Sequence, residues 1–462
     1  MTALHQLSAL ECAGLIRVGS VTSVEVTEHY LHRIRRLDRR LGAFVVVTEE
    51  LALRQARQAD EILRAVGPDG VGALHGVPIA LKDNLDVEDV VTGWGCADRT
   101  DEAIGDDNVV VRLRQAHLPI IGKTQLPEFA LPCYTENLLG GDTANPWRSE
   151  FSPGGSSGGS AAAVSAGLAP LALGTDAGGS VRIPASCCGV VGLRPSNGAV
   201  SNGPSDPSPN GLSVPGVLTR DALDAGALLD VISDPMPGDP TAARAYREPR
   251  GRLRIGLAVD PMVPDLAVAD ECRAAAEKLA AGLQESGHEL VPVDLGKDVA
   301  VADAFRDAWS VVAASFEVDD EEALAPFTRW LRDQGRAVSG VRLHECLTMF
   351  RGVARMLEEM VFGMVDMLVT PTLGMLPQRR GMFRLHRDEE ENFAAMTRFM
   401  PFTPMYNIAG MPAASVPVEV VDGLPVGAML GGPYGSERRI LHEVAMIQSR
   451  AGGAVGLAPG WA

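Results

Sequence analysis

The stretch Phe151–Ala185 restricts the fold of this chain more than any other segment. Two glycine–serine clusters, Gly154–Ser160 and Gly178–Ser180, flank a core that carries almost no charge. Glycine and serine alone are typical of a flexible linker. Here, however, the first cluster continues into small apolar residues that suit a tightly packed helix, and then into an apolar run of strand length. Because glycine permits close backbone approach, we expect a rigid, crowded pair of loops that holds Ser156 and Ser180 near each other.

The composition is that of a globular enzyme. Hydrophobic residues make up 46% of the 462 residues and charged residues 22%, which argues against disorder. The formal net charge of −18 argues against nucleic acid or an anionic membrane as the main partner, because both require clustered Lys and Arg. The longest weakly polar stretch, Ala161–Gly174, is too short to span a bilayer.

The cysteines and the first residues indicate a reduced, cytoplasmic protein. The chain has seven cysteines, an odd number, and no C-x-x-C pair that would suggest zinc or redox chemistry. Cys187 and Cys188 are adjacent in an apolar context, where small buried hydrophobic residues are expected. The segment Met1–Gly14 lacks a basic region and already carries Glu11, so no signal peptide is visible.

Periodicity predicts a mixed α/β chain without internal repeats. Capping boxes at Ser8 and Thr22 predict two helix starts, and residues 1–70 as a whole look like helical cladding. Further helices and strands are expected at 49–66, 254–258, 289–293, 302–364 (mostly helical), 365–370 and 436–450. The polar, turn-rich segment Gly238–Gly251 is a candidate linker, which would put a boundary between lobes near residue 245.

Two features of this pattern could suggest functional sites but have an ordinary structural interpretation. Lys82 ends the apolar strand that begins at Gly76, and a lysine there often buries its stem and keeps its amine in water. The series Met349, Met356, Met360 and Met364 is interpreted as part of the core rather than as a ligand site.

A nucleotide-binding loop is a weak alternative. Gly122–Thr124, which reads G-K-T, resembles the end of a phosphate-binding P-loop. That motif also requires a glycine five positions before Gly122, where this chain has His117. The motif is therefore incomplete.

The first glycine–serine cluster also satisfies a nucleophile motif. Gly154–Gly158 matches G-x-S-x-G, the nucleophile elbow of α/β-hydrolases. An elbow needs a strand directly before it, but Pro146–Pro153 is irregular, and none of the downstream histidines has a distinctive context. A base other than histidine is therefore considered.

At this point the chain closely resembles the amidase signature family of serine hydrolases. The likeness extends over nearly the whole chain, and the sequence G-G-S-S-G-G-S followed by G-T-D-A-G-G-S-V-R-I-P-A is long enough to make chance agreement negligible. The matching segments are Gly76–Asn84, Gly122–Glu128, Asn145–Trp147, Pro153–Ser160, Gly174–Ala185 and Asn407–Pro417.

The resemblance implies a triad and a fold. Residue by residue, it makes Ser180 the nucleophile, Ser156 a serine on a cis peptide bond, and Lys82 the base. The implied fold is a single α/β domain over residues 1–462, with a central mixed β-sheet covered on both sides by α-helices. Its signature core would span about 71–200 and its variable, substrate-facing part about 300–405. No metal or organic cofactor is implied, and Asp176 and Arg182 match positions that we interpret as loop scaffolding.

The chemistry of these residues agrees with that assignment. A serine hydroxyl is a weak nucleophile until a base accepts its proton, and lysine accepts a proton only when neutral. Lowering the pKa of Lys82 from about 10.4 to near 7 requires roughly 4 kcal/mol, which burial can supply. Ser156 would relay the proton from Ser180 to Lys82 and return it to the leaving amine. The backbone N–H groups of Ala177, Gly178, Gly179 and Ser180 would form the oxyanion hole.

The predicted function is hydrolysis of a carboxamide to a carboxylic acid and ammonia or an amine. The substrate is a small-molecule amide that the sequence does not name, and its pocket is expected to include Cys133 and Tyr134 together with residues of 302–405. No nucleic acid or membrane partner is expected, and a homodimer is compatible with this prediction.

Two alternatives keep the same triad. The first is the glutaminase component of an aminoacyl-tRNA amidotransferase, whose relatives carry a tyrosine-rich segment where Gly340–Phe362 has no tyrosine. The second is an acyl transferase that passes the acyl group to an amine or alcohol instead of water.

Overall fold

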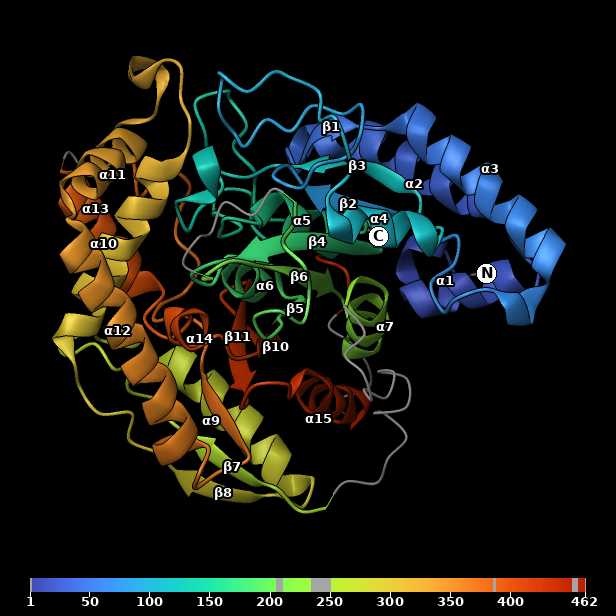
Figure 1. Ribbon diagram of the computed structural model, residues 1–462. Coiled ribbons are helices and arrows are strands. Elements are labelled where there is room, and N and C mark those ends of the chain that lie inside the picture. Colours follow the sequence, from blue (N-terminus) through green and yellow to red (C-terminus); the bar gives the residue numbers. More distant parts are fainter. Residues whose placement is uncertain (1, 205–210, 234–250, 385–387, 451–455, 462) are drawn as a thin grey trace.

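A mixed sheet of eleven strands runs through the residues that the computed structural model describes, 2–204, 211–233, 251–384, 388–450 and 456–461 (Figure 1). Its strand order is β1-β3-β2-β4-β6-β5-β10-β11-β9-β7-β8. The strands are β1 (Phe44–Val47), β2 (Ile79–Lys82), β3 (Ile120–Thr124), β4 (Leu171–Asp176), β5 (Val191–Arg194), β6 (Val214–Thr219), β7 (Arg254–Leu257), β8 (Glu289–Pro292), β9 (Met367–Pro371), β10 (Ala413–Val421) and β11 (Leu424–Gly431).

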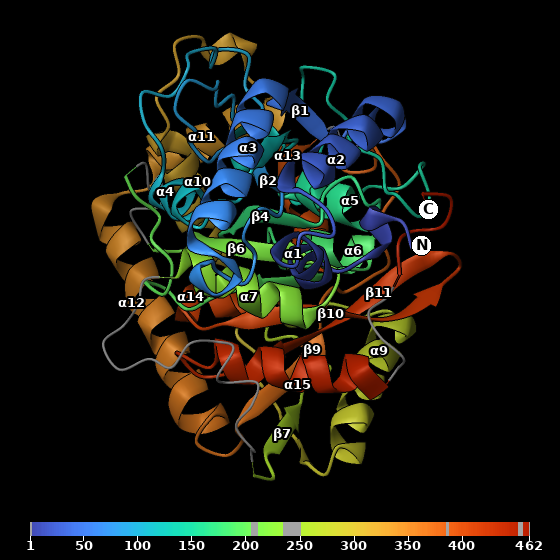
Figure 2. The same ribbon diagram turned by 90° about the vertical axis from the view of Figure 1, so that its right-hand side faces the viewer.

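Helices cover both faces of this sheet. Every residue of the central strands β2, β4, β6, β5, β11 and β9 is buried. Because successive side chains of a strand point to opposite faces, burial of every residue means that both faces are covered. This confirms the expected α/β class, and Figure 2 shows helices in front of and behind the strands. The longer helices are α1 (Ala9–Arg17), α2 (Ser23–Leu37), α3 (Glu49–Val66), α4 (Asn108–Gln115), α5 (Gly158–Ser165), α6 (Arg182–Cys188), α7 (Ala222–Ile232), α9 (Asp270–Glu285), α10 (Val299–Ser315), α11 (Pro326–Ala337), α12 (Gly340–Met356), α13 (Glu389–Phe399), α14 (Pro404–Ala409) and α15 (Glu437–Arg450).

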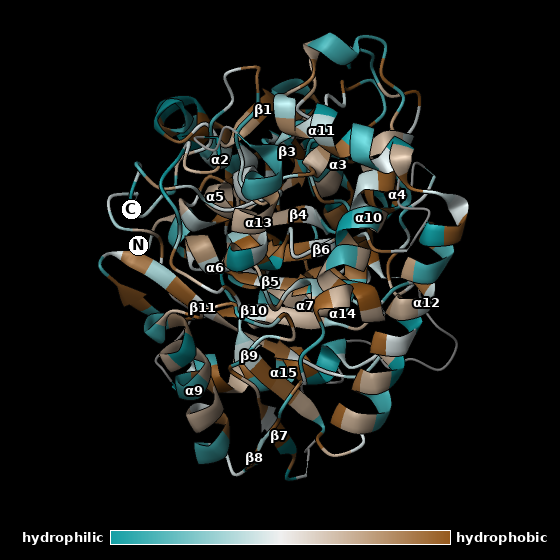
Figure 3. Ribbon diagram, turned by 90° about the vertical axis from the view of Figure 1, so that its left-hand side faces the viewer, coloured by the Kyte–Doolittle hydropathy of each residue, from teal (hydrophilic) through white to brown (hydrophobic). Residues whose placement is uncertain are grey.

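Most of the predicted elements are present. The capping boxes at Ser8 and Thr22 start α1 and α2, each with the reciprocal hydrogen bonds to a glutamate three residues on. The segments expected at 254–258 and 289–293 contain the strands β7 and β8, which pair in parallel and form a β-α-β unit with α9. Figure 3 shows the mainly hydrophobic strands β9 and β7 near the centre of the lower half of the molecule.

Two of the expectations were incomplete. Residues 1–70 are not only helical, because β1 pairs antiparallel with β3 at the edge of the sheet. The methionine series is not all core, since Met360 is 64% exposed and Met364 48% exposed. By contrast, Cys187 and Cys188 are fully buried, as expected, and all seven cysteines are buried and unbridged.

The candidate linker Gly238–Gly251 lies almost entirely outside the described residues. The strands on its two sides, β6 and β7, nevertheless belong to the same sheet. The variable segment around residues 300–400 forms a layer of helices, α10 to α13, beside one end of the central strand β4 (Figure 1).

Candidate active site

Lys82 is the last residue of β2, between β3 and β4. Its side chain is fully buried. The Lys82 Nζ atom lies 2.7 Å from Ser156 Oγ, and it also donates to Thr175 Oγ1 at 3.0 Å and to the Thr175 carbonyl at 3.4 Å. The amine therefore faces the loop that carries Ser156 and not solvent, which excludes the interpretation of Lys82 as a surface-seeking lysine at a strand end.

Burial changes the protonation of this amine. Loss of solvent lowers the pKa of Lys82 to about 7, against a smaller opposing effect of the Asp176 carboxylate. A neutral amine keeps two N–H groups, and Thr175 offers a hydroxyl and a carbonyl oxygen as acceptors for them. The lone pair of the nitrogen is then left for the Ser156 hydroxyl proton.

Ser156 lies in a loop that only glycine neighbours permit. The peptide bond between Gly155 and Ser156 is cis. A Cβ atom on Gly155 would lie 2.7 Å from the backbone of Tyr134, and one on Gly158 would lie 2.1 Å from Thr135 Oγ1. The packed helix predicted after this cluster is α5, which begins at Gly158 and is buried throughout.

Ser180 shares one cavity with Ser156. Both residues line it, and Ser180 is 8% exposed whereas Ser156 is fully buried. The Ser180 carbonyl accepts a hydrogen bond of 3.0 Å from the Ser157 N–H, which joins the two serine loops directly. Among the described hydrogen bonds none connects the two hydroxyls, so the structure contains the lysine–Ser156 contact and the proximity of the serines but not a closed chain of three groups.

The loop after β4 carries backbone donors without an acceptor, with one exception, and its residues Ala177 and Ser180 line the cavity. In the described part of the chain, the N–H groups of Ala177, Gly178 and Ser180 have no hydrogen-bond acceptor. The Gly179 N–H instead donates to Asp176 Oδ1 at 2.8 Å, so its expected place in the oxyanion hole is corrected. Gly179 has φ +126°, and a Cβ there would lie 2.3 Å from Thr403 Oγ1, which explains why this position needs glycine.

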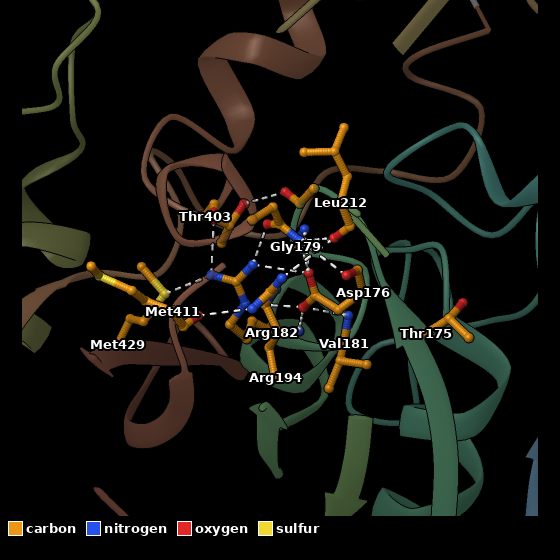
Figure 4. Close-up of polar contacts among 12 residues, drawn as sticks. Thr175, Asp176, Gly179, Val181, Arg182, Arg194, Leu212, Thr403, Met411 and Met429 are labelled. Atoms are coloured by element: carbon orange, nitrogen blue, oxygen red, sulfur yellow. Dashed lines mark hydrogen bonds and ion pairs between the residues drawn. The ribbon is translucent and has the colours of Figure 1, made fainter. Parts of the chain in front are cut away.

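A buried ion pair holds that loop (Figure 4). The Arg182 guanidinium binds both oxygens of Asp176 at 2.9 Å, and both side chains are fully buried. Burial alone would raise the pKa of Asp176, but the Arg182 charge and its hydrogen bonds hold that pKa well below its usual range. Asn407 Nδ2 donates to Asp176 Oδ1 at 2.9 Å, and Thr403 Oγ1 donates to the Gly178 carbonyl at 2.7 Å.

The cavity at Ser180 is lined by aromatic and aliphatic side chains with uncharged polar ones among them. It encloses about 400 Å³ of empty space, part of it open to solvent. Apart from the two serines, its walls include Trp94, Phe129, Leu131, Trp309 and Phe316. None of the described residues that line it is Asp, Glu, Lys, Arg or His. The cavity therefore suits an uncharged substrate.

The predicted pocket residues Cys133 and Tyr134 do not line this cavity. The Cys133 side chain is buried in the hydrophobic core, and Tyr134 lines a separate cavity and stacks on Phe383 with ring centroids 5.2 Å apart. Residues just before Cys133 in the same loop line the cavity instead. Among them, Phe129 and Ala130 both adopt positive φ angles. The prediction was thus wrong by a few residues along the same loop.

Several residues of the site were missed by sequence reasoning. Thr175 Oγ1 accepts hydrogen bonds from both Lys82 and Asn84, the latter at 2.9 Å, and so links β2 to β4. Thr403, just before α14, and Asn407, within α14, both bind the loop after β4. Asn84, Thr175 and Asn407 lie inside segments that match the family, so the signal was present, but nothing in the sequence told which atoms they bind.

The G-K-T segment has a structural explanation. Lys123 is fully buried in β3, and its Nζ lies 3.1 Å from Asp83 Oδ1 and donates to Thr92 Oγ1 at 2.9 Å. Its ammonium group is thus bound within the chain and does not extend toward a phosphate site. Among the described residues, no group of three or more His, Cys, Asp and Glu side chains could hold a metal ion.

Known proteins agree with this geometry. The family model described as Amidase matches residues 25–441. The putative amidase AmiB2 of Mycobacterium tuberculosis is 37% identical over 446 residues, which cover 95% of this chain and 94% of the relative. One component of the glutamyl-tRNA(Gln) amidotransferase of Thioalkalivibrio sulfidiphilus is 33% identical over 483 residues, which cover 96% of this chain and 97% of the relative.

A solved structure leads to the same conclusion. The 6-aminohexanoate cyclic dimer hydrolase complexed with substrate has a TM-score of 0.88 at 29% identity and covers 99% of this chain and 98% of its own. No described helix combines the length and the apolar character needed to cross a membrane. The chain belongs to the amidase family, the amidase signature enzymes, which hydrolyse amide C–N bonds.

Proposed function

We propose that this chain hydrolyses its amide through an acyl-enzyme on Ser180. Ser180 Oγ attacks the carbonyl carbon and gives its proton to Ser156 Oγ, while Ser156 gives its own proton to Lys82 Nζ. The 2.7 Å contact between Ser156 and a fully buried lysine with a pKa of about 7 carries this proposal. A lysine with that pKa is neutral in a large fraction of molecules at neutral pH, as a base must be.

The rest of the reaction uses the same groups. The negative oxygen of the tetrahedral intermediate is bound by the free N–H groups of Ala177, Gly178 and Ser180, each worth roughly 3 to 4 kcal/mol in comparable sites. The proton on Lys82 returns through Ser156 to the leaving amine. Water then attacks the acyl-enzyme with the same base and releases the acid.

The walls of the cavity support a neutral, apolar amide as the substrate. Trp94, Trp309 and Phe316 offer aromatic faces, and the described lining residues carry no charge. A charged substituent on the substrate would lose its hydration there without a partner, which costs several kcal/mol. Aryl and alkyl amides are therefore the proposed class.

The glutaminase alternative is less well supported. The relatives named as components of glutamyl-tRNA(Gln) amidotransferases cover the chain well, so the family alone does not separate the two functions. Free glutamine carries an ammonium and a carboxylate group next to each other, and the cavity has no charged side chain for either one among its described lining residues. In this proposal, the protein is a cytoplasmic enzyme that works without partner chains and without nucleic acid.

The test compares ammonia or amine release by the pure chain from aryl amides, alkyl amides and glutamine. We expect release from the neutral amides and not from glutamine. Replacing Ser180 by Ala should lower kcat on the order of 10⁴- to 10⁶-fold without changing the fold, because the substitution removes one oxygen atom from a cavity wall. Ser449→Ala, at an exposed position on α15, is the matched control.

Each result has a distinct meaning. Near-normal turnover by Ser180→Ala would exclude Ser180 as the nucleophile. Glutamine turnover that requires added partner chains would favour the amidotransferase component, and acyl products formed with added amines would favour an acyl transferase. Light scattering on the same sample decides between a monomer and a homodimer.

A further inference from the structure

We propose that this chain has a second small-molecule site, which binds an uncharged aliphatic compound behind α14 and modulates turnover at Ser180. The site is an apolar cavity between α10, α12, α13 and α14. It is separate from the cavity at Ser180, because the two share no lining residue. Binding there does not depend on the mechanism proposed above, whereas its effect on turnover does.

The cavity and the groove outside it together have the size and chemistry of a ligand site. The cavity itself is narrow, with about 50 Å³ of room for water-sized groups, and it opens into a groove with about 680 Å³ of such room, so only the joined space reaches the range of small-molecule pockets. The walls of the cavity include Val301, Phe305, Val353, Met405 and Ile408, and Thr397 contributes the only hydroxyl among its described lining residues. No described lining residue is charged. Such walls favour aliphatic carbon and oppose a buried charge.

A wider groove on the surface leads into this cavity. The groove, with about 1190 Å³ of empty space including solvent, shares Met262, Leu295, Val301 and Val353 with the cavity. Its remaining walls contain two half-buried methionines, Met349 and Met356, whose flexible thioethers adapt to different apolar shapes. Unlike the cavity, the groove also carries the charged side chains of Lys297, Asp298 and Glu345. A molecule with an aliphatic chain and a neutral polar end fits both parts.

The inner wall of the cavity packs against the loop after β4, which carries Gly178 and Ser180. Phe305 lines the cavity, and a Cβ atom on Gly178 would lie only 3.1 Å from Phe305 Cζ. Phe305 also stacks on Trp309, with ring centroids 5.8 Å apart, and Trp309 lines the cavity at Ser180. A ligand that displaces Phe305 therefore also displaces Trp309 and reshapes the wall of the cavity at Ser180.

The short helix α14 makes a second connection. Met405 and Ile408 line the cavity, whereas Asn407 binds Asp176 and Thr403, just before the helix, donates to the Gly178 carbonyl. One side of the helix thus holds the loop after β4, and another side would contact the ligand. An occupant that fixes α14 changes how firmly the free N–H groups of the loop are held, and this changes kcat rather than KM.

The experiment uses octan-1-ol as the probe and the full chain. Isothermal titration calorimetry should show one saturable site, and steady-state assays with a short neutral amide such as acetanilide should show a change in kcat at the same concentrations. Val353→Phe places a ring in the space that cavity and groove share, and we expect at least a ten-fold loss of affinity and loss of the effect on kcat. Val341→Phe is the matched control, because Val341 lies on the same helix and is 72% exposed.

A second variant keeps the test possible if the first one does not fold. If Val353→Phe does not fold, Ala302→Leu fills the same cavity with a smaller addition. Octan-1-ol that raises KM alone and binds Val353→Phe as tightly as the unaltered chain would place the ligand in the cavity at Ser180 and overturn the proposal. Absence of saturable binding up to the solubility limit would overturn it too, and because calorimetry needs no turnover, this result is independent of the proposed amidase mechanism.

Discussion

At the scale of single residues, we expect the environment of Lys82 to decide the pH dependence of the enzyme. Burial lowers its pKa to about 7, so the neutral form that accepts a proton grows as the pH rises through 7. We therefore expect kcat/KM to rise from pH 5 and to level off about one unit above 7. Lys82→Ala should lose most of the activity at pH 7 and recover part of it at high pH, where hydroxide replaces the base. A Lys82→Ala variant with unaltered kinetics across this range would exclude Lys82 as the base.

The same burial predicts a cost in stability. Because the pKa of Lys82 is about 7 in the folded chain and near 10.5 when unfolded, the unfolded state binds an extra proton between these values. The free energy of unfolding therefore rises by about 1.4 kcal/mol per pH unit between pH 7 and pH 10.5. At pH 7 and below, the folded chain carries the full cost of the buried lysine. We expect Lys82→Met to raise the melting temperature at pH 7 and the difference to shrink towards pH 10. A variant that is less stable at both pH values would contradict this assignment.

At the scale of elements, the ends of β2 and β3 are joined by the buried pair of Asp83 and Lys123. Asp83 also accepts the Gly93 N–H at 3.1 Å and, through its carbonyl, the Trp94 N–H at 3.1 Å, so the pair fixes the turn that carries one wall of the cavity. Lys123→Met leaves a buried carboxylate without its partner, which should cost about 3 to 5 kcal/mol in urea unfolding and raise KM.

A double variant of this pair and a control at an exposed ion pair test whether the buried charges cause the effect. Combining Asp83→Asn with Lys123→Met removes both charges and should restore part of the lost stability. Arg35→Met breaks an exposed pair with Glu49 and should cost at most about 1 kcal/mol. Equal effects of Lys123→Met and Arg35→Met would show that the buried pair does not support the site.

Local elements were more predictable than the contacts between them. The helices at Ser8 and Thr22 follow from capping boxes, which depend on residues three positions apart. The triad residues could be proposed because they lie in long, distinctive segments. The contact of Gly179 with Asp176 and the wall formed by Phe129 instead of Cys133 depend on backbone angles. The hydrogen bond of Thr403 to Gly178 joins segments 225 positions apart. Neither periodicity nor composition carries that information.

At the scale of the molecule, one sheet joins the two halves of the chain. β5 pairs antiparallel with β6 on one side and with β10 on the other, so strands from before and after residues 234–250 are hydrogen-bonded to each other. The loop after β4 is likewise held from both halves, since Asp176 precedes residues 234–250 and Asn407 follows them. Of the variable helices, α10 adds residues to the walls of both cavities, and α12 adds Val353 to the wall of the cavity behind α14.

This arrangement predicts that the chain unfolds as a single domain, although a chain of 462 residues is long enough for two. Calorimetry should give one transition, because separating β5 from β10 would expose buried strands on both sides. Amidase activity should be lost over the same temperature range, since Asp176 and Asn407 come from opposite halves. Two resolved transitions, or loss of activity well below a single one, would show that the halves are separate folding units and that the sheet does not bind them into one.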